Sequence, residues 1–255
     1  MYPTRPRFVF AGFLCFAVIY AWQASFPGRY FGSYLLLVGL VGGLAVSAFR
    51  RWDADETLAI GLLFAIPMAD QLIELRLRHG ELVQQLLLYV LVPLSLLWLT
   101  QPKVRPSDVG LSFGIRRTTV RITAALLLIA ACLSVVGLGF TSMTRYYPIW
   151  RTGTVTIEEY LRNEVIISVI MFASEFFYRG IVLFVLARRS FWGSILLQTL
   201  PYAFLHLGKP DIEVPYSFVA GIAFGWANLR SRSVIPSWTT HAVGSALFDA
   251  LILLT

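Results

Sequence analysis

The sequence predicts an all-α fold, a polytopic transmembrane helix bundle of about eight or nine helices. Hydrophobic residues make up 57% of the 255 residues and charged residues 14%, whereas a soluble domain carries about 25% charged residues. Mean hydropathy is +0.71, and apolar blocks of helix length recur from one end of the chain to the other. This pattern excludes a soluble domain with a single membrane anchor. The Lys and Arg residues lie in short gaps between the blocks, so the net charge of +7 favours basic cytoplasmic loops over nucleic-acid binding.

Each apolar block is expected to form one helix, with ends uncertain by a few residues. The nine blocks are 8–25, 31–49, 57–75, 82–99, 119–142, 162–186, 191–207, 214–229 and 237–254. The seventh and eighth are barely long enough to span a bilayer, and eight helices result if one short block is re-entrant.

A long polar link separates the first four blocks from the rest. Residues 101–118 contain Pro102, Pro106, Gly110 and Gly114, which indicates a loop with at most one interfacial turn. We therefore expect two regions. Residues 1–118 form N-terminal transmembrane helices with a cytoplasmic link, and residues 119–255 form a membrane core with catalytic potential.

The N-terminal block resembles a signal peptide because Arg5 and Arg7 precede it. Trp22 does not suit the small-residue cleavage site of such a peptide, so we interpret the block as a retained first helix. With the N-terminus in the cytoplasm, the inside loops hold more Lys and Arg than the outside loops. This predicts an integral protein of the cell (inner) membrane, with a cytoplasmic N-terminus and an external C-terminus.

Two charges interrupt the block at 162–186. Glu175 and Arg179 lie four residues apart, on one helical face, and can form a charge-assisted hydrogen bond. Charges at this depth are expensive unless they are paired or hydrated. The pair either only stabilises the helix or forms part of a polar site within the membrane.

Two histidines favour the polar site. His206 ends the seventh block, and His241 begins the last one. In the last block, His241, Ser245 and Asp249 follow one another at intervals of four, which makes a polar stripe on an apolar helix. Because lipid cannot solvate such a stripe, we expect it to face the bundle interior. Glu175, His206 and His241 can meet only if the seventh and eighth helices are short or tilted. Residues 209–215 are then expected to lie at a cavity mouth.

One carboxylate and two imidazoles support two kinds of hydrolysis. A carboxylate can deprotonate a water while an imidazole orients it or donates to an oxyanion. The same groups are also a possible two-His, one-carboxylate metal site. The cysteines, Cys15 and Cys132, lie in apolar blocks without a CxxC pair, which indicates neither a disulfide nor a thiolate metal site.

The order of these motifs resembles the CPBP (CAAX protease and bacteriocin-processing, or Abi) family of intramembrane endopeptidases, over about residues 160–250. Glu175 and Arg179 match the second Glu and the Arg of the family's E-E-x-x-x-R motif. His206 matches the His of F-x-x-x-H, with Tyr202 at the aromatic place, and His241 matches the His of H-x-x-x-N.

Two positions depart from the family pattern. Ser174 stands where the family has its principal water-activating Glu, and Ser245 stands where it has an Asn that helps to hold the oxyanion. A serine at 245 can still donate a hydrogen bond, but Ser174 cannot replace a carboxylate base. Adjacent helical residues point about 100° apart, so Glu175 replaces that base only if the helix rearranges. Otherwise the chemistry is altered or lost.

The resemblance implies a glutamic-type endopeptidase that needs no metal or other cofactor. Its site residues would be Glu175, Arg179, His206, His241 and Ser245. Its partners would be membrane lipid and a membrane-associated protein or peptide substrate, with or without a prenyl group, and no nucleic acid. Two alternatives stay open, namely an inactive relative with an immunity or scaffold role and, from the buried charges alone, a proton-coupled transporter.

Other acidic residues have no clear assignment from sequence. Asp70 and Glu74 either pair with Arg76 or Arg78 at a helix end or form a second acidic patch in the cavity. Asp211 and Glu213, which follow His206, are equally open.

Overall fold

The computed structural model describes residues 6–25, 37–43, 53–73 and 80–255. Every regular element in these ranges is a helix, which confirms the all-α fold. Residues 37–43 are helical and belong to the second predicted block, most of which lies outside the described residues. The other elements are α1 (Pro6–Ser25), α3 (Ala54–Leu72), α4 (Gly80–Leu86), η1 (Leu87–Leu91), α5 (Val92–Thr100), η2 (Pro106–Val109), α6 (Arg116–Gly137), α7 (Thr141–Tyr146), α8 (Ile157–Phe176), η3 (Phe177–Val182), α9 (Leu183–Ala187), α10 (Phe191–Phe204), α11 (Glu213–Ser231) and α12 (Ile235–Leu254).

Three described helices are long and apolar enough to cross a membrane. They are Gly80–Thr100, Arg116–Gly137 and Ile157–Ala187, and a shorter apolar helix covers Phe10–Ser25. The segments α4, η1 and α5 form the first of these spans, and α8, η3 and α9 form the third. The chain is therefore a helical membrane bundle, as its composition predicts.

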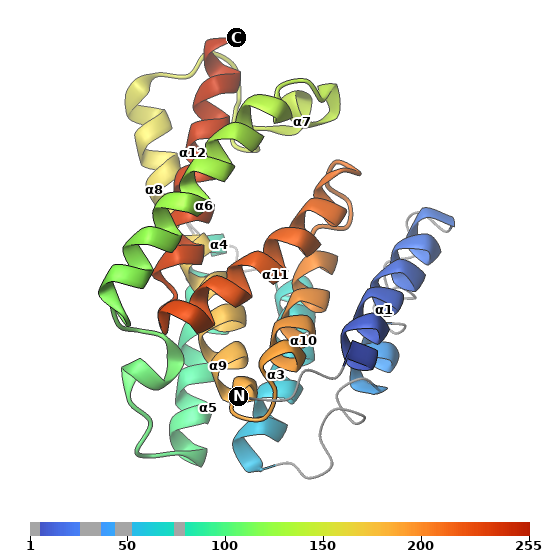
Figure 1. Cartoon of the computed structure of the whole chain (residues 1–255). Helices are drawn as coiled ribbons and strands as arrows, with labels where there is room; N and C mark the ends of the chain where they lie inside the picture. Colours follow the sequence, from blue (N-terminus) through green and yellow to red (C-terminus); the bar gives the residue numbers. More distant parts are fainter. Residues whose placement is uncertain (1–5, 26–36, 44–52, 74–79) are drawn as a thin grey trace.

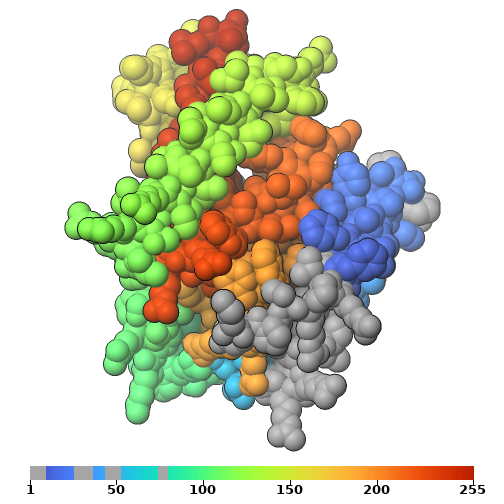
Figure 2. Space-filling model, viewed as in Figure 1, coloured from blue at the N-terminus to red at the C-terminus, as the bar shows by residue number. Residues whose placement is uncertain are grey.

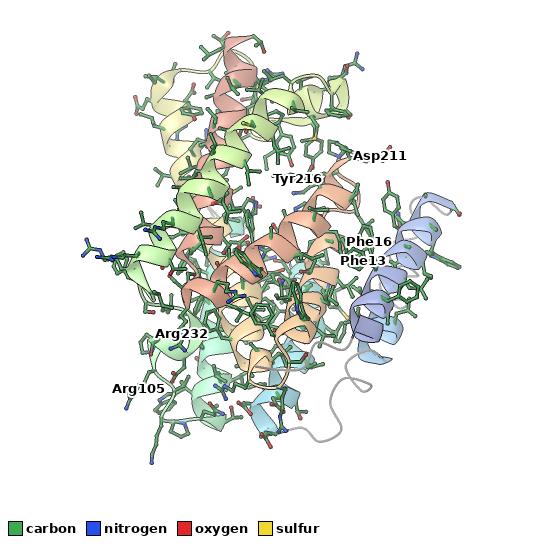
Figure 3. The ribbon with its side chains drawn as sticks, in the orientation of Figure 1. Phe13, Phe16, Arg105, Asp211, Tyr216 and Arg232 are labelled. Atoms are coloured by element: carbon green, nitrogen blue, oxygen red, sulfur yellow. The ribbon has the colours of Figure 1, made fainter. Side chains whose placement is uncertain are left out.

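The helices pack into two groups joined by α11. Helix α12 packs against α6 and α8, while α10 packs against α1 and α11. Figure 1 shows α11 running obliquely between these groups. On its far side from α12, the ring of Phe218 stacks at 4.0 Å on Phe16 of α1 and meets Phe13 edge-on at 5.4 Å. Both α1 rings point towards α11 in Figure 3.

The ends of α8 and α10 differ from those predicted in ways that affect the site. Helix α8 begins at Ile157 rather than 162, because Thr156 and Glu159 form a capping box in which each side chain accepts from the other's backbone N–H, at 3.2 and 2.9 Å. Helix α10 ends at Phe204, so His206 lies in the turn beyond it. With 14 residues, α10 is about 21 Å long, shorter than a hydrocarbon core of about 30 Å.

Ion pairs join the start of α3 to the turn between α9 and α10. Arg188 donates to Asp55 at 2.5 Å, and Arg189 donates to Glu56 at 2.7 Å and to Asp53 at 2.8 Å. The hydrogen bonds and charge of Glu56 raise the pKa of Arg189 above its ordinary value. The predicted topology places both segments on the same side of the membrane, and these contacts agree with that placement.

The link between α5 and α6 is an ordered loop that docks on the turn between α11 and α12. It contains one short helix, η2, in agreement with the single turn expected there. Ile115 N donates to Ser231 O at 2.8 Å, and Val234 N donates to Gly110 O at 3.0 Å. Between these bonds Gly114 adopts a left-handed conformation, with φ of +54°.

Replacing Gly114 with alanine is expected to destabilise the protein by at least about 2 kcal/mol through backbone strain. A Cβ at this position would also lie 2.0 Å from Ser231 O. The matched control is Gly61→Ala, since a Cβ at this helical position meets nothing within 4 Å and should stabilise α3 by up to about 1 kcal/mol. Unfolding of the two purified variants in detergent measures the difference. Equal stability would show that the loop does not need its docked conformation.

Candidate active site

The core of the site is the ion pair between Glu175 and Arg179. The side chains of both residues are 0% exposed, and Arg179 Nη1 donates to Glu175 Oε1. Glu175 is in the last turn of α8, and Arg179 is in η3, a single turn of π-helix. The predicted pair therefore forms, within a helix long enough to cross a membrane.

A second π-helical turn, η1, packs against α8 and contacts η3 through the ring of Tyr89. The ring of Tyr89 lies 5.4 Å from that of Phe177 and 6.2 Å from that of Tyr178. Turns of this kind often occur at functional sites. Because η3 begins after Glu175, it changes the position of Arg179 but leaves Ser174 and Glu175 on one regular helix.

His241 is the second partner of Glu175. Its Nδ1 lies 2.9 Å from Glu175 Oε1. A carboxylate only accepts, so Nδ1 carries the proton and donates. The imidazole is 25% exposed while Glu175 is fully enclosed. Glu175 thus orients a histidine that solvent or substrate can reach.

His206 lies close to the same group of residues. Its Nδ1 donates to Tyr202 O at 3.0 Å, which leaves Nε2 as the free nitrogen. The Tyr202 ring lies 5.0 Å from the His206 ring and 6.4 Å from the His241 ring. The Arg179 guanidinium covers the same tyrosine ring at 3.8 Å. Both histidines and the ion pair are therefore gathered around Tyr202, because α10 is short.

Sequence reasoning missed the residues that fix the helices beneath the site. Asn228 of α11 is fully buried and donates to Arg179 O at 3.3 Å and to Ser237 Oγ at 2.8 Å. Ser237 N donates back to Asn228 Oδ1 at 3.3 Å. These bonds tie η3, α11 and α12 together. The sequence did contain a signal for Asn228, since it is a polar residue within the apolar block 214–229.

The two serines at the positions that depart from the family pattern lie in different surroundings. Ser174 is half-buried and donates to Met171 O of its own helix at 3.0 Å. Ser245 is half-buried on α12, one turn beyond His241. Ser174 and Glu175 are adjacent residues of regular α8, so their side chains point about 100° apart.

Farther along α12, Asp249 is buried on the face of the helix that packs on α8. Trp150 Nε1 donates at 3.3 Å to Glu164, the α8 carboxylate beside it. Asp249 therefore lies inside the bundle, as the polar stripe predicts.

Glu213, which the sequence left open, lies beside His206. Its Oε1 is 4.0 Å from His206 Nε2, accepts from Tyr147 at 2.6 Å and accepts from Lys209 at 3.4 Å. Burial, followed by the Glu213 charge, raises the pKa of Tyr147, so the phenol keeps its proton and donates. Pro210 and Glu213 are buried while Asp211 is exposed, so 209–215 lies partly inside the molecule.

Asp70 belongs to a separate polar cluster between α3 and the α4–η1 helix. Its carboxylate accepts from Gln84 at 2.8 Å, from Gln85 at 3.0 Å and from Tyr89 at 3.1 Å. Glu74, Arg76 and Arg78 lie outside the described residues, so the predicted pairing with those arginines stays a prediction.

The surface has an opening between two helices (Figure 2), and the side chains of the described residues are not arranged as a metal centre. Figure 2 shows an opening in the surface between α6 and α11. Among residues 6–25, 37–43, 53–73 and 80–255, no three His, Cys, Asp or Glu side chains are grouped as metal ligands. The site presents two separate imidazole–carboxylate pairs: His241 is hydrogen-bonded to Glu175 at 2.9 Å, and His206 Nε2 lies 4.0 Å from Glu213 Oε1.

Comparison with known proteins links this site to a family. Residues 160–247 match the model of the type II CAAX prenyl endopeptidase Rce1-like family. No curated protein matches the chain, and no solved structure matches it. The matched segment contains Glu175, Arg179, His206 and His241, and this similarity supports membership of the CPBP family, which includes the type II CAAX prenyl endopeptidases.

Proposed function

We propose that the protein is a glutamic-type intramembrane endopeptidase that hydrolyses a peptide bond with an activated water. The gathering of His206, His241 and the Glu175–Arg179 pair around Tyr202, within membrane helices, carries this proposal. The family match gives it independent support, since it names a CAAX-type endopeptidase. Residues 119–255 form the catalytic core in this proposal, and residues 1–118 form the accompanying helices.

The proposed chemistry assigns different tasks to the two buried charges and the two histidines. Arg179 neutralises Glu175, and Glu175 holds the ring of His241 so that Nε2 faces the accessible side. When His241 carries a second proton, its Nε2–H donates to the oxyanion that forms as water attacks the carbonyl. Ser245, one turn away, is the proposed second donor, and His206 Nε2 orients the water.

The proposed substrate is a membrane-associated protein or peptide, with or without a prenyl group, cut near its C-terminus. We place the protein in the cell (inner) membrane with a cytoplasmic N-terminus, following the distribution of basic loops. Membrane lipid is then its second partner. No metal or other cofactor takes part in the proposed reaction.

A second candidate is an inactive relative that binds a partner as an immunity or scaffold protein. Ser174 favours it, because no carboxylate occupies the direction in which the family places its base. The proton-coupled transporter has no comparable observation in its favour.

A cleavage assay separates these candidates. The purified protein in lipid vesicles is given a farnesylated peptide that ends in a CAAX sequence, and the same peptide without the lipid, and products are identified by mass. Wild type is expected to cleave the lipidated peptide, and His206→Ala to lose at least about 100-fold in kcat. Thr239→Ala, a half-buried residue two positions before His241, is the control. Tight binding of either peptide without any cleavage would favour the inactive relative.

A further inference from the structure

The family's water-activating carboxylate has no counterpart on α8. Ser174 has no carboxylate, and Glu175 is fully enclosed, with one oxygen shared between Arg179 and His241. A base must reach the proton that it takes, directly or through one water. Glu175 meets this requirement poorly, because its side chain is 0% exposed.

We infer that Glu213 of α11 is the general base of the proposed peptidase, acting together with His206. This inference rests on the proposed function. The Glu213 side chain is 9% exposed, and its Oε1 lies 4.0 Å from His206 Nε2. A water at 2.8 Å from both atoms would subtend an angle of about 90°, which permits hydrogen bonds to both. One water proton then faces the carboxylate and the other faces the imidazole, which leaves an oxygen lone pair for attack.

Two donors, one of them charged, hold the position of the Glu213 carboxylate. Lys209 provides a compensating charge at 3.4 Å, and Tyr147 donates at 2.6 Å, both to Oε1. The second oxygen, Oε2, is buried and accepts no hydrogen bond from the described residues. Buried carboxylate oxygens normally have a donor, so Oε2 keeps an unfilled acceptor position.

The location of Glu213 fits an approach of substrate from the end of α11 that faces α7 (Figure 3). Figure 3 places its neighbours Asp211 and Tyr216 at the end of α11 that faces α7. Glu213 lies between them in sequence, and Tyr147, which holds it, directly follows α7. The opening in Figure 2 lies between α11 and α6, which precedes α7.

The proton balance of the step is simple. Glu213 takes one proton from the water as the water oxygen bonds to the carbonyl carbon and the carbonyl oxygen becomes an oxyanion. The protonated Glu213 then gives that proton to the leaving nitrogen. The C–N bond breaks as the carbonyl re-forms, and the products are a carboxylic acid, which ionises, and an amine.

The test compares Glu213→Gln with two matched variants in the vesicle assay with the farnesylated peptide. Glu213→Gln is expected to lower kcat by about 10²–10⁴-fold with little change in KM. Asp211→Asn changes an exposed acidic residue two positions away and should leave kcat unchanged. Tyr147→Phe removes the bond that holds Glu213 but keeps the carboxylate, so it should cost less than about tenfold, the share of one neutral hydrogen bond.

Two further variants separate catalysis from a structural role. Glu213→Ala should regain part of its activity in added formate, which supplies a carboxylate but cannot restore a tether. Glu213→Asp keeps a negative charge near Lys209, but its shorter side chain moves the carboxylate away from His206. This variant should lower kcat at least tenfold, and it serves as the test if Glu213→Gln does not fold. If Glu213→Gln or Glu213→Asp keeps the wild-type kcat, the inference is wrong but the proposed function stands. The same conclusion follows if kcat falls equally in Glu213→Ala and Tyr147→Phe and formate does not restore it. Absence of cleavage by wild type overturns the proposed function as well.

Discussion

Replacing Arg179 with methionine is expected to lower the free energy of unfolding by about 3–5 kcal/mol, the usual cost of breaking a buried ion pair. The guanidinium and the Glu175 carboxylate are both fully enclosed, so removing one charge leaves the other without compensation. Methionine keeps much of the side-chain length but loses the contact with the Tyr202 ring at 3.8 Å. Unfolding in detergent measures the effect.

The double variant Glu175→Gln/Arg179→Met isolates the charge contribution. If unpaired charge causes the loss, the double variant should be more stable than Arg179→Met, although it removes more native groups. The exposed Arg230 of α11, replaced by methionine, controls for the loss of an arginine in general. A double variant that is less stable than Arg179→Met would assign the loss to packing around Tyr202 instead.

Local spacing was sufficient to predict the helices and the ion pair. A run of apolar residues fixes a membrane helix because lipid leaves the backbone no other partners. The four-residue interval between Glu175 and Arg179 fixes their common face. Because lipid cannot solvate a polar side chain, the sequence also predicted that Asp249 lies inside the bundle, where it is beside Glu164.

Contacts between distant segments could not be predicted in the same way. Tyr147 and Glu213 are 66 positions apart, and Asp55 and Arg188 are 133 apart. No periodicity links such pairs, since they depend on how helices cross. The pairing of Glu213 with His206 depends on α10 ending at Phe204, which lets the chain turn back towards the site. The length of the seventh block indicated a short helix. It did not indicate which acidic residue would lie beside His206.

His241→Ala is expected to lower kcat for the farnesylated peptide by about 10²–10³-fold, as loss of an oxyanion donor does in other hydrolases. The fold should be affected less than by Arg179→Met, because the imidazole is a quarter exposed and Arg179 still neutralises Glu175. Circular dichroism and unfolding of the same preparation check that comparison. A fall in stability as large as that of Arg179→Met would assign His241 a structural role.

Ser245→Ala distinguishes one oxyanion donor from two. If both side chains hold the oxyanion, Ser245→Ala should lower kcat by about tenfold, the share of one neutral hydrogen bond, and Ser245→Asn should keep or raise the wild-type rate. Asparagine at position 245 would place an amide donor one helical turn after His241. If Ser245→Ala keeps the wild-type kcat while His241→Ala loses it, the oxyanion is held by His241 and Ser245 only fills space on α12.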